Sequence, residues 1–185
     1  MPTLLWGKEP TKDVPAEYPY LQGKKVLILV WADPETLFEY SRVQLELSEH
    51  VAASMKPNIP GVTFAPNRSV TDFQHAEPNW DRTDPAELGT RFGAQRVLMI
   101  ELTQYTTREP DSPHLYRGRI AANVKVYDPA YKNSSPSYRA TVETVYPQDS
   151  VGEWGTDDVG IRKATMEAFA LDVAGKFFDR KVKVK

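Results

Sequence analysis

The residues of this chain that could support catalysis concentrate in one polar segment. His75 and Glu77, with Asp72, Asp81 and Asp84 nearby, form its one cluster of acids around a histidine. Carboxylates bind hard cations, and a histidine beside an acid can transfer protons. Acids in a solvent-exposed loop are the alternative explanation. If the chain is an enzyme with an unfamiliar site, the segment 66–84 is where that site is expected.

The common catalytic and nucleotide-binding motifs are absent from the sequence. It has no Gly-x-Ser-x-Gly, no Gly-x-x-x-x-Gly-Lys-Ser/Thr and no Gly-x-Gly-x-x-Gly. His50, His75 and His114 lie far apart and lack a metal-binding spacing. With no cysteine, the chain has no disulfide, thiolate zinc site or cysteine nucleophile. These observations predict no catalytic residue, no cofactor and no metal.

Two carboxylates on expected strands are further candidates for acid–base chemistry. Glu101 lies in an otherwise apolar run, and Glu143 lies on another strand. Burial would raise the pKa of Glu101 and make it a site candidate. The alternative is cross-strand ion pairing on a solvent-exposed face, because the outward positions of these strands are basic. They are Arg117, Arg119, Lys125 and Arg139.

Tyrosines and arginines around the same strands indicate a binding face. Tyrosine is favoured at interfaces because it buries a large area and keeps a polar tip, although it is also favoured in strands as such. The predicted binding face consists of Tyr116, Arg119, Tyr127, Tyr138 and Arg139.

The first half of the sequence predicts strands alternating with helices. The apolar run 26–31 is typical of a central strand covered on both faces. Asp33-Pro34-Glu35 then favours a helix start, and apolar residues spaced by three and four continue to Met55. A short strand is expected at 62–65 and an irregular loop at 66–83. Asp84-Pro85 begins a short helix to about Phe92, closed by Gly93.

The second half predicts three antiparallel strands and a closing helix. The segments 96–106, 119–127 and 138–146 alternate apolar and polar residues over part or all of their length. A final helix is expected from 156 or 157 to 179. The fold class is therefore α/β (α+β): a single mixed β-sheet with helices packed on it, in the order β-α-β-α-β-β-β-α.

Length and composition predict one domain with irregular ends. The 185 residues fit a single domain, expected at 24–180. Four prolines in residues 1–23 favour an extended proline-rich arm, and residues 181–185 form a basic tail. No apolar run approaches the roughly 20 residues that span a bilayer.

The charge balance argues against a broad nucleic-acid interface. The chain has 23 basic and 25 acidic residues and a net charge of -2, whereas such domains are usually strongly basic. No nucleic-acid partner is expected. A nucleic-acid-binding module using the basic strand residues, with Tyr127, stays open as an alternative.

Two segments resemble a known group of domains. Gly23-Lys24-Lys25-Val26-Leu27-Ile28-Leu29 and Glu87-Leu88-Gly89-Thr90-Arg91-Phe92-Gly93-Ala94-Gln95-Arg96-Val97-Leu98 carry the likeness. They are similar to the N-terminal domain of the TolB translocation protein and to related domains of curli-secretion and penicillin-binding-protein activator lipoproteins. The resemblance implies a non-enzymatic module of the periplasm or outer membrane that docks other proteins. It also implies that the arm is a tether following a removed signal or a lipid anchor upstream of residue 1.

The sequence thus favours a non-enzymatic protein-binding or assembly module of a bacterial cell envelope. An enzyme with a site in the 66–84 loop and a nucleic-acid-binding module are the alternatives.

Overall fold

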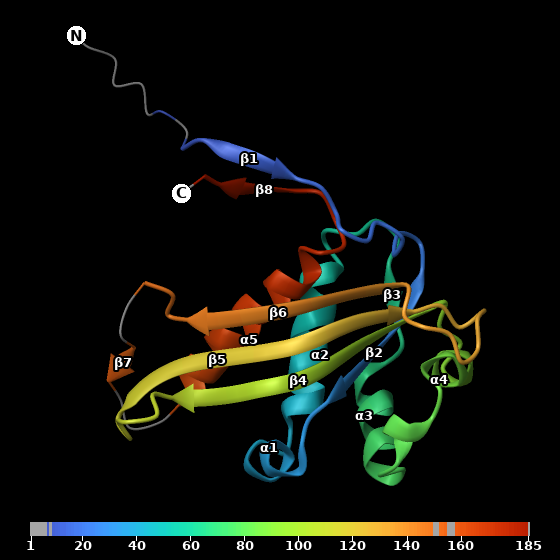
Figure 1. Ribbon diagram of the computed structural model, residues 1–185, viewed down its shortest axis with the longest axis horizontal. Helices are drawn as coiled ribbons and strands as arrows, with labels where there is room; N and C mark the ends of the chain where they lie inside the picture. Colours follow the sequence, from blue (N-terminus) through green and yellow to red (C-terminus); the bar gives the residue numbers. More distant parts are fainter. Residues whose placement is uncertain (1–6, 8, 150–151, 155–157, 185) are drawn as a thin grey trace.

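The computed structural model describes residues 7, 9–149, 152–154 and 158–184, and its main element is a mixed β-sheet (Figure 1). The strand order is β3 (Thr63–Phe64), β2 (Lys25–Trp31), β4 (Arg96–Arg108), β5 (Leu115–Tyr127) and β6 (Tyr138–Tyr146). β2 pairs in parallel with β3 and β4, and β4, β5 and β6 pair antiparallel. A short strand, β7 (Glu153–Trp154), also pairs with β5. The predicted mixed α/β fold is confirmed.

One face of the sheet is covered by the two longest helices, α2 (Val43–Met55) and α5 (Val159–Ala174). Alternate strand residues such as Ile28, Ile100 and Val124 point to this face and pack with both helices in the larger core cluster. Phe169 of α5 is completely buried there. Burial of so many branched and aromatic side chains is the main stabilising contribution to the domain.

Among the described residues, the helices on the other face cover only β2 and β4. Helices α3 (Asn67–Ala76) and α4 (Pro85–Arg91), with the 3-10 turn η1 (Trp80–Arg82), lie against the opposite residues of these strands, including Leu27, Leu29 and Val97. The same face of β5 and β6 carries half-buried and exposed polar residues such as Lys125, Arg139 and Thr141.

The expected helix starts at Asp33 and Asp84 are confirmed. The Asp33 carboxylate accepts the amide of Thr36 at 2.9 Å at the start of α1 (Pro34–Glu39), and hydrogen bonding to Thr36 lowers the Asp33 pKa. The Asp84 carboxylate accepts the amide of Ala86 at 3.1 Å at the start of α4. Gly93 follows α4 with a φ of 63°, which closes the helix in the left-handed conformation.

The expected irregular loop at 66–83 is wrong, because this segment contains α3 and η1. Val70, Phe73 and Trp80 are buried in the second core cluster, so a few apolar residues at helical spacing fix an otherwise polar helix. The Gln74 side chain adds a hydrogen bond of 3.1 Å from Nε2 to the Val30 carbonyl oxygen.

Two other helices differ from their expected lengths. The helix expected from Asp33 to Met55 is divided into α1 and α2 at Tyr40, whose ring packs against Tyr105 of β4. The last helix begins at Val159 and ends at Ala174, so residues 175–179 are not helical. Its expected start at 156 or 157 lies outside the described residues.

The expected arm and tail meet in a second, two-stranded sheet. β1 (Thr11–Val14) pairs antiparallel with β8 (Arg180–Lys183), and this ribbon projects from the body of the molecule (Figure 1). Residues 1–6 of the arm and Lys185 of the tail lie outside the described residues.

Candidate functional site

The candidate site lies at the carboxyl end of the two central parallel strands. β2 ends at Trp31, which pairs with Glu101, whereas β4 continues to Arg108. The carboxyl ends of parallel strands are where open α/β sheets usually bind their ligands. Here the extension of β4 lies beside α1 and the first residues of α5.

An irregularity in β4 determines which side chains face the helices. Leu102 pairs with Ala122 and Gln104 with Ala121, so β4 has one residue more than β5 at this point. The resulting bulge shifts the alternation of buried and exposed side chains along β4 by one residue. Leu102 is buried before the bulge, and Tyr105 and Thr107 are buried after it, while Thr106 is exposed.

A chain of hydrogen bonds joins three elements at the site. Thr107 Oγ1 donates to Asp158 Oδ2 at 2.8 Å, and it lies 3.1 Å from the Tyr40 hydroxyl. Because the single proton of Thr107 is used for Asp158, the Tyr40 hydroxyl donates to Thr107. Burial raises the pKa of Tyr40 and keeps its phenol protonated at neutral pH. These hydrogen bonds thereby hold three parts of the chain together: the segment that links α1 to α2, the end of strand β4, and the start of α5.

The ring of Tyr105 is the inner wall of the site. Its centroid lies 4.7 Å from that of Tyr40 in an edge-to-face arrangement. The side chain is 9% exposed, and its hydroxyl has no hydrogen-bond partner among the described residues. Burial raises the Tyr105 pKa far above its usual value, so the group is a neutral donor at physiological pH.

Two cavities adjoin Tyr40, and Tyr105 lines one of them. One of about 340 Å³ is lined by Tyr40, Tyr105 and the β4–β5 connection, including Pro110 and Pro113. A smaller one of about 130 Å³ is lined by residues of α1 and α2 with Arg162. Glu39 and Tyr40 line both cavities.

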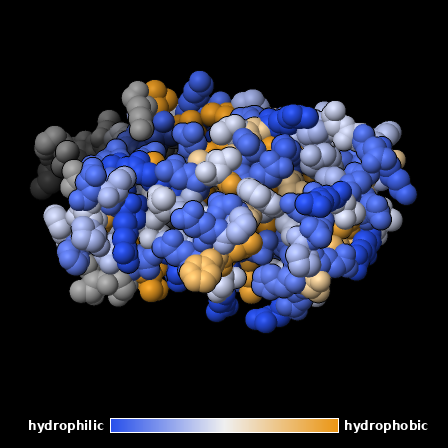
Figure 2. All heavy atoms as spheres, turned by 60° about the horizontal axis from the view of Figure 1, so that its bottom comes forward, coloured by the Kyte–Doolittle hydropathy of each residue, from blue (hydrophilic) through white to orange (hydrophobic). Residues whose placement is uncertain are grey.

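Three large apolar side chains are exposed around the same end of the sheet, and we call them the apolar rim: Phe38, Trp154 and Val159. They are 92%, 75% and 58% exposed, respectively. Phe38 lies two residues before Tyr40, Val159 follows Asp158, and Trp154 pairs with Leu115 at the start of β5. In the face drawn in Figure 2, hydrophobic atoms form small patches separated by hydrophilic ones.

The five residues of the predicted binding face do not share one face of the sheet. Tyr116 and Tyr138 lie on the helix-covered face, where Tyr116 is buried and Tyr138 packs against Tyr18 and Phe177. Arg119, Tyr127 and Arg139 lie on the opposite face, with Tyr127 against the second core cluster and Arg139 exposed.

Ion pairs engage Glu101 and Glu109 and most of the basic residues on the strands, whereas Glu143 is exposed. Lys125 Nζ lies 2.9 Å from Glu101 Oε1, and Arg119 Nη2 lies 2.9 Å from Glu109 Oε1. Arg117 also lies 3.9 Å from Glu109. Cross-strand pairing with Lys125 thus accounts for Glu101, and Arg117 and Arg119 share the one carboxylate of Glu109, so three of the four basic residues named for nucleic-acid binding have an acidic partner.

The histidine cluster of segment 66–84 is not assembled into a site. Asp72 and His75 are exposed on α3, and Glu77 pairs with Arg91 at 2.8 Å. Within the described part of the chain, no group of three or more His, Asp or Glu residues could hold a metal ion.

Sequence patterns did not identify Phe38, Tyr105 or Thr107 as site residues. Phe38 falls outside the apolar stripe Leu37, Tyr40, Val43, which was a usable sign of exposure. Tyr105 and Thr107 depend on the bulge, and no residue type in Thr103-Gln104 indicates one.

None of the helices that the structure describes is long and apolar enough to cross a membrane.

Comparison with known proteins finds related folds but no related sequences. No protein-family model and no curated protein matches the chain. The PelC dodecamer of Paraburkholderia phytofirmans superposes with a TM-score of 0.51 at 9% identity, covering 91% of this chain and 98% of that chain. Lipoprotein GNA1162 of Neisseria meningitidis gives a TM-score of 0.48 at 14% identity, covering 81% and 97%. A minor lipoprotein of Acinetobacter baumannii gives 0.36 at 11% identity, covering 82% and 89%. The similarity to PelC is one of fold, and the structures that resemble this chain include bacterial lipoproteins.

Proposed function

We propose that this chain is a non-enzymatic protein-binding and assembly module of a bacterial cell envelope, and that the apolar rim is its docking surface. The observation that carries the proposal is the exposure of Phe38 and Trp154 at one end of the sheet. Exposed apolar side chains that gather in one region mark interaction sites, and aromatic anchors contribute strongly to protein interfaces. The hydrogen-bonded Tyr40, Thr107 and Asp158 fix the backbone next to Phe38 and Val159, which lowers the entropy cost of docking.

The assembly part of the proposal is supported by the fold. The PelC chain, which shares this architecture over 91% of the present chain, forms a dodecamer. The envelope part rests on the resemblance of residues 23–29 and 87–98 to domains of envelope proteins. Both are analogies at the level of fold or motif, and the docking surface is what can be tested directly.

The first experiment addresses location. The native protein is followed by antibody through fractionation of its source cells into cytosol, periplasm and membranes. Recovery with the periplasm or with envelope membranes is expected. Recovery in the cytosol alone would overturn the envelope part of the proposal.

The second experiment addresses the docking surface. A photo-reactive phenylalanine analogue replaces Phe38, and a matched control carries it at Tyr131, which is 65% exposed in the β5–β6 turn. A discrete cross-linked product from position 38, lost when Trp154 is changed to Ser and absent from position 131, is expected. Equal labelling from both positions would show that the rim has no special affinity for a protein.

A further inference from the structure

The outer edges of β1, β8, β3 and β6 have no strand partner among the described residues, and β8 is the most basic of these strands. β6 is the last strand of the large sheet, and no described segment pairs with its outer edge. β8 pairs only with β1, so its outer edge has no partner among the described residues either. Unpaired edges bind other strands readily unless they are protected.

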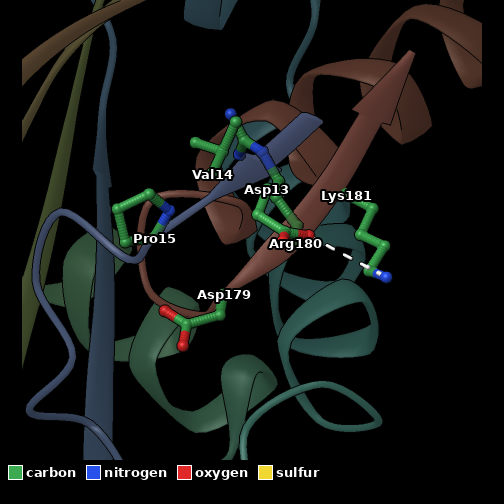
Figure 3. A pocket seen from close by; sticks show the side chains of 6 residues that line it. All are labelled: Asp13, Val14, Pro15, Asp179, Arg180 and Lys181. Atoms are coloured by element: carbon green, nitrogen blue, oxygen red, sulfur yellow. Dashed lines mark ion pairs between the residues drawn. The ribbon is translucent and has the colours of Figure 1, made fainter. Parts of the chain in front are cut away.

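The ribbon of β1 and β8 is held within one chain by its backbone pairing and by two exposed ion pairs, Lys181 with Asp13 and Lys183 with Glu9. Its strands have four residues each, and none of these residues is buried. A cavity of about 360 Å³ lies at its base between Asp13, Val14, Pro15 and residues 179–181 (Figure 3). The ion pair of Lys181 with Asp13, drawn there as a dashed line, spans 3.9 Å between exposed side chains and is therefore weak. Two-stranded ribbons are marginally stable alone, so a third strand would stabilise this one.

We propose that β8 of one copy of this chain pairs antiparallel with β6 of a second copy and extends its sheet. Opposite charges at Lys181 and Glu143 favour the pairing of these two edges. β8 reads Arg180-Lys181-Val182-Lys183, with three basic residues in four. On β6, Glu143 is exposed. Beyond the end of the strand, Asp149 and, from α5, Asp172 line a cavity of about 510 Å³.

One antiparallel register places opposite charges across from each other on the open face of the sheet and apolar residues across from each other on the helix-covered face. With Val182 opposite Val142, Lys181 lies opposite Glu143 on the open face. Arg180 then lies opposite Thr144, whose hydroxyl donates to Asp172 at 2.5 Å on the α5 side. Val184, which is exposed, lies opposite Ala140. The one basic residue of β6, Arg139, falls outside the paired stretch 140–144.

The contact is head-to-tail, because each copy gives β8 to one neighbour and β6 to another. Such interfaces form closed rings when the rotation between copies closes, and filaments when it does not. The contact involves no residue of the apolar rim, so its failure would leave docking at Phe38 untouched.

Cross-linking tests the pairing directly, since the chain has no cysteine. Full-length Thr141→Cys and Lys183→Cys proteins are mixed and treated with a short bis-maleimide. These two exposed positions are opposite each other in the register, and Tyr131→Cys replaces Thr141→Cys in the control mixture. A dimer-sized product only in the first mixture is expected. If Lys183→Cys protein alone gives as much dimer-sized product as the first mixture, the ribbons pair with each other and the proposal is overturned. The same amount of product in the Tyr131→Cys control mixture would also overturn it.

A charge exchange tests the register. Sedimentation velocity of the unchanged protein over a concentration series should show self-association. Glu143→Lys or Lys181→Glu should each weaken it about tenfold by placing like charges opposite each other, and the double variant should restore most of the loss. A protein that stays monomeric up to its solubility limit, or single variants that associate as well as the unchanged protein, would overturn the proposal.

Discussion

The hydroxyl of Tyr40 lies 3.1 Å from Oγ1 of Thr107, and this contact ties the link between two helices to the far end of strand β4. Thr107 passes the connection on to Asp158 at the start of α5. One buried hydroxyl thus joins the three segments that position the apolar rim.

Replacing Thr107 by Val should therefore destabilise the protein. Valine keeps the shape of the side chain but leaves the Tyr40 hydroxyl and the Asp158 carboxylate without their shared partner. We expect a loss of about 2 kcal/mol in the free energy of unfolding, measured by urea denaturation. Thr106→Val is the matched control, because Thr106 is exposed on the same strand. Equal effects of the two changes would contradict the role given to Thr107.

Gly118 in β5 should not tolerate alanine. A Cβ at this position would lie 1.8 Å from Oγ1 of Thr165, a buried residue of α5. Because the helix or the strand must move, Gly118→Ala should cost about 2 kcal/mol of stability. Thr165→Ala should recover part of that cost in the double variant, as a double-mutant cycle would measure.

Gly160 is the control for this glycine change. Apart from its chain neighbours and the backbone of its own helix, no described residue lies within 4 Å of a Cβ added there, and the residue is in the first turn of α5. Gly160→Ala should leave the thermal midpoint unchanged or raise it, because alanine is favoured over glycine in helices. A fall in the midpoint equal to that of Gly118→Ala would show that the close approach to Thr165 is not the cause.

Glu17 should make stability depend on pH. Its carboxylate accepts hydrogen bonds from Lys176 at 2.8 Å and from Tyr138 at 2.5 Å, and these, with Lys176 as the larger cause, lower the Glu17 pKa. A lowered folded-state pKa adds stability above the unfolded-state pKa of about 4.5, and the gain is lost as pH falls through the folded-state value.

Glu17→Gln measures this contribution. Because Glu17 is largely exposed to solvent, the variant should lose only about 0.5 kcal/mol of unfolding free energy at pH 7. The difference from the unchanged protein should shrink towards zero at low pH. A difference that stays constant down to the acid-unfolding region would show that the charge of Glu17 does not contribute.

The main sheet and the starts of two helices were predictable because local patterns determine them. The apolar run of β2, the alternation in β5 and β6, and the Asp-Pro starts at Asp33 and Asp84 each fix an element without long-range information. α3 was missed because its pattern rests on Val70 and Phe73 alone, and its helical state depends on burial against β2. The pairing of β1 with β8 joins segments at opposite ends of the chain, which no local pattern encodes.

The candidate site was less predictable than the fold for a related reason. The binding face predicted from Tyr116, Arg119 and their neighbours assumed that aromatic and basic residues of adjacent strands share a side. Alternation places Tyr116 and Arg119 on opposite sides of β5, and the bulge in β4 turns Tyr105 and Thr107 towards the helices. A bulge arises from the competition between twist and pairing of two strands, so the sequence of one strand does not specify it.

Phe38 provides the test that separates docking from stability. With 92% of its surface exposed, it contributes little to the core, so Phe38→Ser should change the free energy of unfolding by less than about 0.5 kcal/mol. The neighbouring Leu37 packs against the larger core cluster, and Leu37→Ser should cost about 2 kcal/mol or more. If Phe38→Ser keeps full stability and loses partner binding, its exposure serves recognition. If it destabilises the fold as much as Leu37→Ser, Phe38 is a packing residue and the apolar rim loses its central member.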